Sequence, residues 1–197
     1  NGVWQPSQKQ FIEGGFSTYE AFGLAFKDYY QCGPFNVLND KVYSGQPLDV
    51  IGLGAIDDLI IVVASPEFQL LTKTAREVLP KTVPMKDFIS NMANACLIVA
   101  AFTNNDVKLL GRCVDDRIIE PARAPLIPGF YDVKKAALDS GAFGCSISGA
   151  GPSIFAVTDN LSAGKEIGKA MQEAFKRNNL NSKIYVSKVN KEGAKVV

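Results

Sequence analysis

From residue 57 onward, hydrophobic and polar residues follow patterns that predict regular structure. Residues 59–64 form a continuous, mostly β-branched apolar run, which is typical of a strand buried on both faces. Residues 183–188 alternate between apolar and polar side chains and predict a further strand. The clearest amphipathic helix is predicted over residues 162–177, where apolar residues recur at helical spacing: Ile167, Ala170, Met171, Ala174 and Phe175.

The residues between these elements complete an α+β pattern. Helices are predicted at about residues 70–78, 86–103, 105–112 and 128–141, and two strands at 143–148 and 153–157. We therefore expect a four-stranded, mostly antiparallel sheet with helices packed on one face. Its expected core contains Ile60, Ile61, Val62, Ile147, Phe155, Val157, Phe175 and Val186.

Residues 1–56 differ in composition from the rest of the chain. They are rich in aromatic residues and glycine, and their apolar residues follow neither helical nor strand spacing. A short helix over residues 17–30, capped by Ser17, is the one element expected there. We therefore divide the chain into an irregular N-terminal extension or docking segment, residues 1–56, and a domain, residues 57–197. Because the sequence opens on Asn1 rather than methionine, we expect a processed or truncated N-terminus.

Composition narrows the function classes. The 197 residues are 47% hydrophobic and 21% charged, and the net charge of +1 favours neither nucleic acid nor an anionic membrane as a partner. The apolar run from Ala95 to Phe102 is too short to span a bilayer. The sequence has four scattered cysteines and no histidine, so we expect no metal site. Cys96 and Cys145 are expected in the core because their neighbours are apolar.

Residues 141–153, Gly-Ala-Phe-Gly-Cys-Ser-Ile-Ser-Gly-Ala-Gly-Pro-Ser, form the most specific stretch of the sequence. Glycines between two apolar strands allow positive φ and a close approach of the backbone to another group. Spacing alone favours a tight hairpin whose glycines serve only the turn.

This glycine stretch resembles the third motif of the GHMP small-molecule kinases, in which a glycine loop borders the nucleotide phosphates and the substrate. Two more segments resemble homoserine kinases of that superfamily, in the same order and spacing: residues 65–68 with 72–76, and residues 119–129 (Ile-Glu-Pro-Ala-Arg-Ala-Pro-Leu-Ile-Pro-Gly). The resemblance covers about residues 57–197, is nearest to the plant, plastid type, and implies the ferredoxin-like C-terminal domain of that superfamily.

The resemblance implies a substrate site. The matching positions for homoserine contacts are Thr72, Arg76, Arg123, Ser148 and Gly149, with Gly149 and Gly151 in the glycine loop. A guanidinium suits a carboxylate because its planar fork binds both oxygens. From the residues alone, we would favour a solvated Arg76 that pairs with Glu77 or another neighbour, and an ion pair of Arg123 with Glu120 or Asp116.

The phosphate-binding loop of the family has no convincing match in this sequence. Residues 51–56, Ile-Gly-Leu-Gly-Ala-Ile, lack its serine pair, and we interpret them as a linker. Phosphoryl transfer depends on positioned phosphate-binding groups. We therefore expect no catalytic residue and no cofactor on this chain, with ATP and magnesium entering only if an N-terminal kinase half is supplied.

These features favour a non-catalytic linker or scaffold subunit, a pseudoenzyme in a larger plastid assembly of the phycobilisome or photosystem kind. Residues 1–56 would dock other protein chains, with Trp4, Phe11, Phe16 and Phe22 as anchors. Two alternatives stay open: a fragment or one chain of an active homoserine kinase in threonine biosynthesis, and a regulatory module that binds an amino acid such as homoserine. The expected location is the plastid, or otherwise the cytoplasm.

Overall fold

The structure, a computed structural model, describes residues 36–38, 50–53 and 55–189. Residues 56–189 form one compact unit. Outside it, strands β1 (Asn36–Leu38) and β2 (Val50–Gly52) pair antiparallel, although no strand was predicted there. The expected helix over residues 17–30 and the four aromatic anchors lie outside the described residues. The division of the chain after residue 56 stays a prediction.

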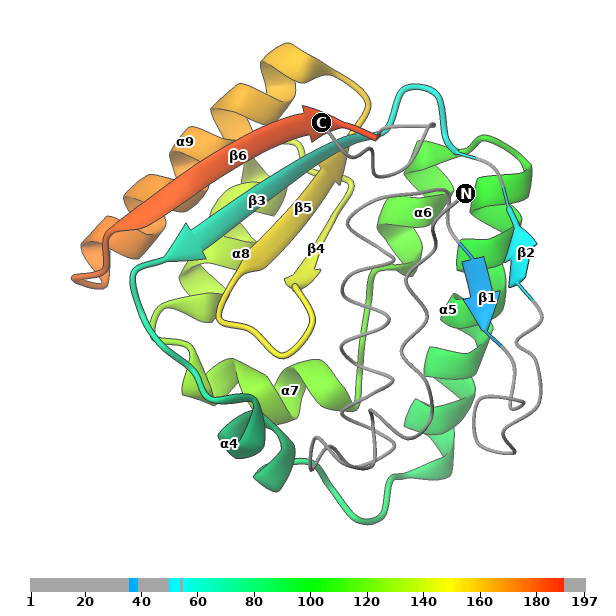
Figure 1. The fold of residues 1–197 in the computed structure, drawn as a ribbon, viewed down its shortest axis with the longest axis horizontal. Helices are drawn as coiled ribbons and strands as arrows, with labels where there is room; N and C mark the ends of the chain where they lie inside the picture. Colours follow the sequence, from blue (N-terminus) through cyan, green and yellow to red (C-terminus); the bar gives the residue numbers. More distant parts are fainter. Residues whose placement is uncertain (1–35, 39–49, 54, 190–197) are drawn as a thin grey trace, which may run out of the picture. The chain divides into compact units, whose positions relative to one another are not determined.

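A four-stranded antiparallel sheet forms the centre of the compact unit, in the strand order β4-β5-β3-β6 (Figure 1). Its members are β3 (Ile60–Pro66), β4 (Gly144–Ile147), β5 (Ile154–Thr158) and β6 (Ser182–Lys188). Val62 lies opposite Ala156 on β5 and Val186 on β6, which places the most apolar strand in the interior of the sheet. The predicted fold class and all four strands are confirmed.

Helices α8 (Phe130–Asp139) and α9 (Leu161–Arg177) cover one face of this sheet (Figure 1). The side chain of Asn160 caps α9 by accepting hydrogen bonds from the backbone N–H groups of Ser162 and Ala163. A Cβ at Gly168 would lie 2.6 Å from Cγ2 of Ile184, so only glycine lets α9 approach β6 this closely. The largest buried side chains between the two layers are Phe130, Ile154, Ile167, Met171 and Phe175.

The expected core was only half right. Ile60, Val62, Val157 and Phe175 are fully buried, whereas Ile61, Ile147, Phe155 and Val186 are partly buried and pack on the edges of the core. The reason is the alternation along β3, where every second residue is buried and the residues between them are half-exposed. One face of the strand is therefore well covered and the other is partly covered. The continuous apolar run had predicted burial on both faces.

Helices α5 (Met85–Thr103) and α6 (Val107–Cys113) form a second apolar cluster, which reaches the sheet at Val157. Only the C-terminal part of α5 joins this cluster. Its first half presents exposed apolar side chains at helical spacing: Met85, Phe88, Ile89 and Met92. Cys96 is also exposed, so its predicted burial is wrong, whereas the predicted burial of Cys145 is confirmed.

Three short helices complete the unit: α4 (Thr72–Glu77), α7 (Ile119–Arg123) and the 3-10 turn η1 (Ala124–Leu126). Sequence patterns predicted α4 but neither α7 nor η1. Within the described part of the chain, no helix is both long and apolar enough to cross a bilayer.

Candidate functional site

The segment after β3 places the first two predicted site residues on α4. Thr72 is the first residue of this helix and is exposed, and Arg76 lies in its last turn and is half-buried. Ala75, between them, is completely buried and fixes the helix against the unit. Its carbonyl oxygen accepts a hydrogen bond from Nε of Arg123, at 3.0 Å.

Helix α7 supplies Arg123, and a single carboxylate organises the approach to this helix. Asp116 accepts hydrogen bonds from the backbone N–H groups of Ile118 and Ile119 at 2.8 and 2.9 Å, and from that of Glu120 at 3.1 Å. Its Oδ1 also accepts from Asn91 of α5, at 2.8 Å. The start of α7 is thereby tied to α5, because the carboxylate that accepts from these three N–H groups is itself bonded to Asn91.

The glycine loop joins β4 to β5. The N–H of Ser148 donates to the carbonyl of Ser153 at 2.8 Å, and the N–H of Gly151 donates to the carbonyl of Ser148 at 3.0 Å. Gly149 and Gly151 have φ values of 59° and 83°, which an L side chain rarely adopts. The two glycines differ in surroundings: a Cβ at Gly149 would meet no described atom within 4 Å, whereas one at Gly151 would lie 2.9 Å from Cδ1 of Ile127.

Arg123 connects these segments. Besides its bond to Ala75, the guanidinium donates from Nη1 to the carbonyl of Gly149 at 2.9 Å. One side chain therefore holds the helix that bears Arg76 against the loop that bears Ser148, although these segments are far apart in the sequence. The proposed ion pair of Arg123 with Glu120 is not formed, since the carboxylate of Glu120 has other partners.

The electrostatics of this site favour an anion. Burial lowers the pKa of Arg123, the nearby Asp116 raises it, and the positive charge of Arg76 lowers it. Two guanidinium groups thus lie close enough to repel each other, and one of them has lost part of its hydration. An anionic ligand near Arg123 would add to the compensation that Asp116 already provides. The open space at Gly149 would let such a ligand approach the backbone.

The structure brings Arg123 into contact with Gly149 and near Arg76, and the roles of the five predicted substrate contacts stay predictions. The sequence patterns gave no indication of the partners of Arg123. They also missed a buried polar cluster, made of Glu120, Lys134 and Ser146. The available signal was Ser146, a polar residue in the otherwise apolar strand β4. Such a residue in a buried strand needs a hydrogen-bond partner.

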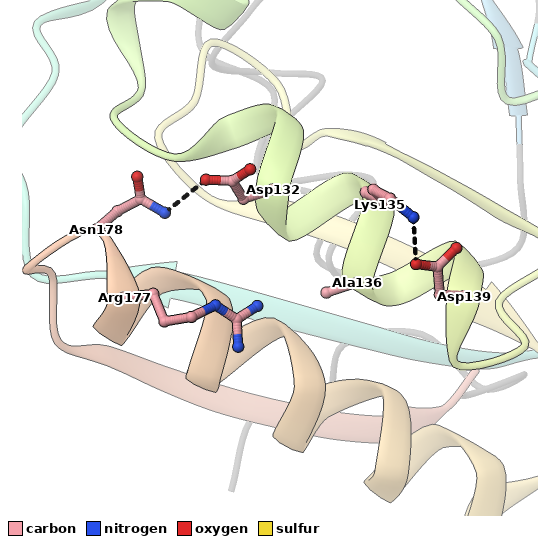
Figure 2. Close-up of a pocket in the computed structure, with 6 residues that line it drawn as sticks. All are labelled: Asp132, Lys135, Ala136, Asp139, Arg177 and Asn178. Atoms are coloured by element: carbon pink, nitrogen blue, oxygen red, sulfur yellow. Dashed lines mark hydrogen bonds and ion pairs between the residues drawn. The ribbon is translucent and has the colours of Figure 1, made fainter.

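A hollow of about 350 Å³ lies between α8 and α9 (Figure 2). It contains none of the predicted site residues and is lined by Asp132, Lys135, Ala136, Asp139, Arg177 and Asn178. Asn178 donates to Asp132 at 2.9 Å, and Lys135 pairs with Asp139 at 2.6 Å. The first contact joins the end of α9 to α8 and the second lies within α8, so the hollow belongs to the packing of the two helices.

Comparison with known proteins identifies the relatives of this unit. Residues 98–177 match the protein family described as GHMP kinases C terminal. The chain is 43% identical over 158 residues to a homoserine kinase from Chlorobium phaeobacteroides, which covers 79% of this chain and 49% of the relative. It is also 45% identical over 156 residues to a homoserine kinase from Arabidopsis thaliana. This match covers 77% of this chain and 42% of that relative.

A solved structure gives the same result. The crystal structure of homoserine kinase from Cytophaga hutchinsonii is similar with a TM-score of 0.83 and 42% identity, over 95% of this chain and 57% of that one. The chain spans about half the length of the curated relatives it matches. The matched family describes a C-terminal domain, so the shared part is the C-terminal half.

Proposed function

We propose that this chain, which carries a GHMP kinase C-terminal domain and is similar to the C-terminal half of homoserine kinases, supplies the homoserine-binding side of such a kinase. The observation that carries the proposal is the bridge made by Arg123, which joins α4 to the glycine loop. The segments that this bridge joins are the ones whose sequences resemble the substrate-contacting motifs of the family.

The residues of this site suit a small amino acid with a free hydroxyl group. Arg76 and Arg123 would hold the carboxylate of homoserine, because a guanidinium offers several donors in one plane. Thr72 and Ser148 would add hydroxyl groups at the exposed rim. Phosphoryl transfer requires above all that the attacking hydroxyl and the phosphate be aligned, so fixing the zwitterion on this side is a catalytic contribution.

The phosphate donor is assigned to the other half of the enzyme. Magnesium, when bound with ATP, neutralises charge that develops on the phosphates. Among the described residues, no group of three or more cysteines and acidic residues could hold a metal ion. ATP with its magnesium would lie against the glycine loop, bound at a site built on an N-terminal kinase half.

The similarity to homoserine kinases supports this kinase role better than the linker subunit that the aromatic N-terminal segment favoured. Docking of partner chains by Trp4, Phe11, Phe16 and Phe22 concerns residues outside the described part and stays a prediction. A plastid location is supported by the Arabidopsis relative and stays a proposal.

A chimera tests the proposed function. Residues 56–189 of this chain replace the matching half of the Cytophaga hutchinsonii kinase, and ADP release is measured with and without homoserine. We expect homoserine-dependent ADP release and none with buffer alone. A chimera that unfolds cooperatively, and so is folded, but releases no ADP in response to homoserine would contradict the proposal.

A further inference from the structure

We propose that Glu120 is a positioning residue for Arg123: its buried carboxylate, held by Lys134 of α8 and Ser146 of β4, fixes α7 so that the guanidinium reaches both α4 and the glycine loop. The effect on the geometry of Arg123 is independent of substrate. The effect on homoserine binding rests on the proposed function.

The first step is the environment of the carboxylate. Glu120 is 7% exposed, and both of its oxygens have partners. Oε1 accepts a hydrogen bond from Nζ of Lys134, and Oε2 accepts from Oγ of Ser146 at 2.6 Å. A buried carboxylate with one side unpaired would carry a large desolvation cost, so this arrangement allows few other placements of the side chain.

The second step is the short length of α7. Five residues make little more than one turn, and an isolated helix of this length is not stable in water. Its place must therefore be set by contacts with other elements. Asp116 fixes the start of the helix, whereas Glu120 fixes its side against α8 and β4.

The third step links Glu120 to Arg123. The two residues are three positions apart, so they lie about one turn and about 4.5 Å of helix rise from each other. A shift of α7 that breaks the contacts of Glu120 would move Arg123 by a similar amount. Its bonds of 3.0 and 2.9 Å to the carbonyls of Ala75 and Gly149 would not survive such a shift.

A charged cluster at this place calls for an explanation other than stability. Buried ion pairs are often no more stabilising than apolar side chains of the same shape, but they allow fewer alternative packings. The cluster of Glu120, Lys134 and Ser146 holds the short helix that also bears Arg123. Specifying the register of α7 is the role that its location favours.

The experiment uses the full chain labelled with ¹⁵N at arginine, in the absence of homoserine. An Arg123→Lys variant assigns the Nε–H resonance of Arg123. In the unmodified chain we expect this proton to exchange with water more slowly than that of the exposed Arg112, because it is hydrogen-bonded to a carbonyl. Glu120→Ala should speed its exchange by about ten-fold, the effect of one hydrogen bond of ordinary strength.

Three further variants distinguish positioning from a general loss of stability. Glu120→Gln should restore most of the protection, because the amide can accept from Lys134 and donate to Ser146. Lys134→Met should weaken protection. The matched control is Lys135→Met, which breaks the exposed pair with Asp139 on the same helix and should leave Arg123 unchanged.

Unchanged exchange at Arg123 in a folded Glu120→Ala chain would overturn the inference, as would equal effects of Lys134→Met and Lys135→Met. If Glu120→Ala does not fold, Ser146→Ala decides, since it removes one of the two partners. We expect Ser146→Ala to speed the exchange of the Arg123 Nε proton as well. An unchanged exchange rate in this variant would overturn the inference.

The functional arm uses the chimera. Glu120→Gln is expected to leave KM for homoserine near its original value, whereas Glu120→Ala should raise it several-fold with little change in KM for ATP. An inactive but folded parent chimera would contradict the proposed function. The exchange experiment would still test the positioning role of Glu120, because it uses the full chain without homoserine. If the chimera is active but the Glu120 substitutions leave the exchange rate of the Arg123 Nε proton unchanged, only the positioning role of Glu120 is contradicted.

Discussion

The sheet with α8 and α9 and the region of α4, α7 and the glycine loop are held together by different interactions. In the first, large apolar side chains such as Met171 and Phe175 are completely buried between two layers. In the second, Arg123 and Asp116 join short segments by hydrogen bonds to backbone groups. We infer that the first region carries the stability of the unit and the second carries the geometry of its site.

The largest effect is expected in the apolar region. Met171→Ala should lower the free energy of unfolding by about 2–5 kcal/mol, because it leaves a cavity among fully buried neighbours. Met85→Ala is the matched control, the same chemical change at a side chain that is 70% exposed on α5. It should cost less than about 0.5 kcal/mol. Urea unfolding measures both changes. If the two substitutions lowered the free energy of unfolding equally, burial of Met171 would not be what stabilises this region.

A smaller effect is expected at the start of α7. Asp116→Ala removes the acceptor for three backbone N–H groups and should cost about 1–2 kcal/mol, the range of a lost helix cap. Asp116→Asn keeps one oxygen acceptor and should cost less. Urea unfolding measures both losses. The region would not be organised by this carboxylate if Asp116→Ala unfolded at the same urea concentration as the parent chain.

Thiol labelling sharpens the comparison without changing the fold. Burial raises the pKa of Cys145 to about 12, an effect that Lys134 opposes and Glu120 assists. At pH 8 roughly one thiol in ten thousand would then be ionised, so a maleimide should not modify Cys145 in the folded chain. The exposed Cys96 should react. Peptide mass spectrometry reads the outcome, and rapid labelling of Cys145 would show that β4 opens readily.

The two regions also differ in how well the sequence predicted them. The strands and the long helices were placed within about two residues, because burial between layers imposes a regular apolar period. Helix α7 was missed because its residues include Pro121 and follow no such period. Its conformation depends on Asp116, Lys134 and Ser146, and on polar contacts across 14 and 26 residues that no local pattern reveals.

The exposed half of α5 shows a further limit. The sequence pattern predicted a helix at residues 86–103, but Phe88, Met92 and Cys96 on this helix are exposed, so the pattern does not say whether a helix face is covered. The same pattern on α9 is buried because Gly168 lets that helix approach the sheet. Periodicity therefore predicts which residues share a face, and only close packing decides which face is buried.

In the proposed function Arg123 fixes homoserine against the glycine loop, and the kinetics of the chimera with Arg123→Lys test this role. Lysine keeps the charge but loses the planar fork. We expect kcat/KM for homoserine to fall roughly 10- to 100-fold, the loss of a hydrogen bond to a charged group, with KM for ATP unchanged. Arg112→Lys, at an exposed position on α6, is the control and should have no effect. An unchanged kcat/KM for homoserine in the Arg123→Lys chimera would show that the guanidinium of Arg123 does not hold the substrate.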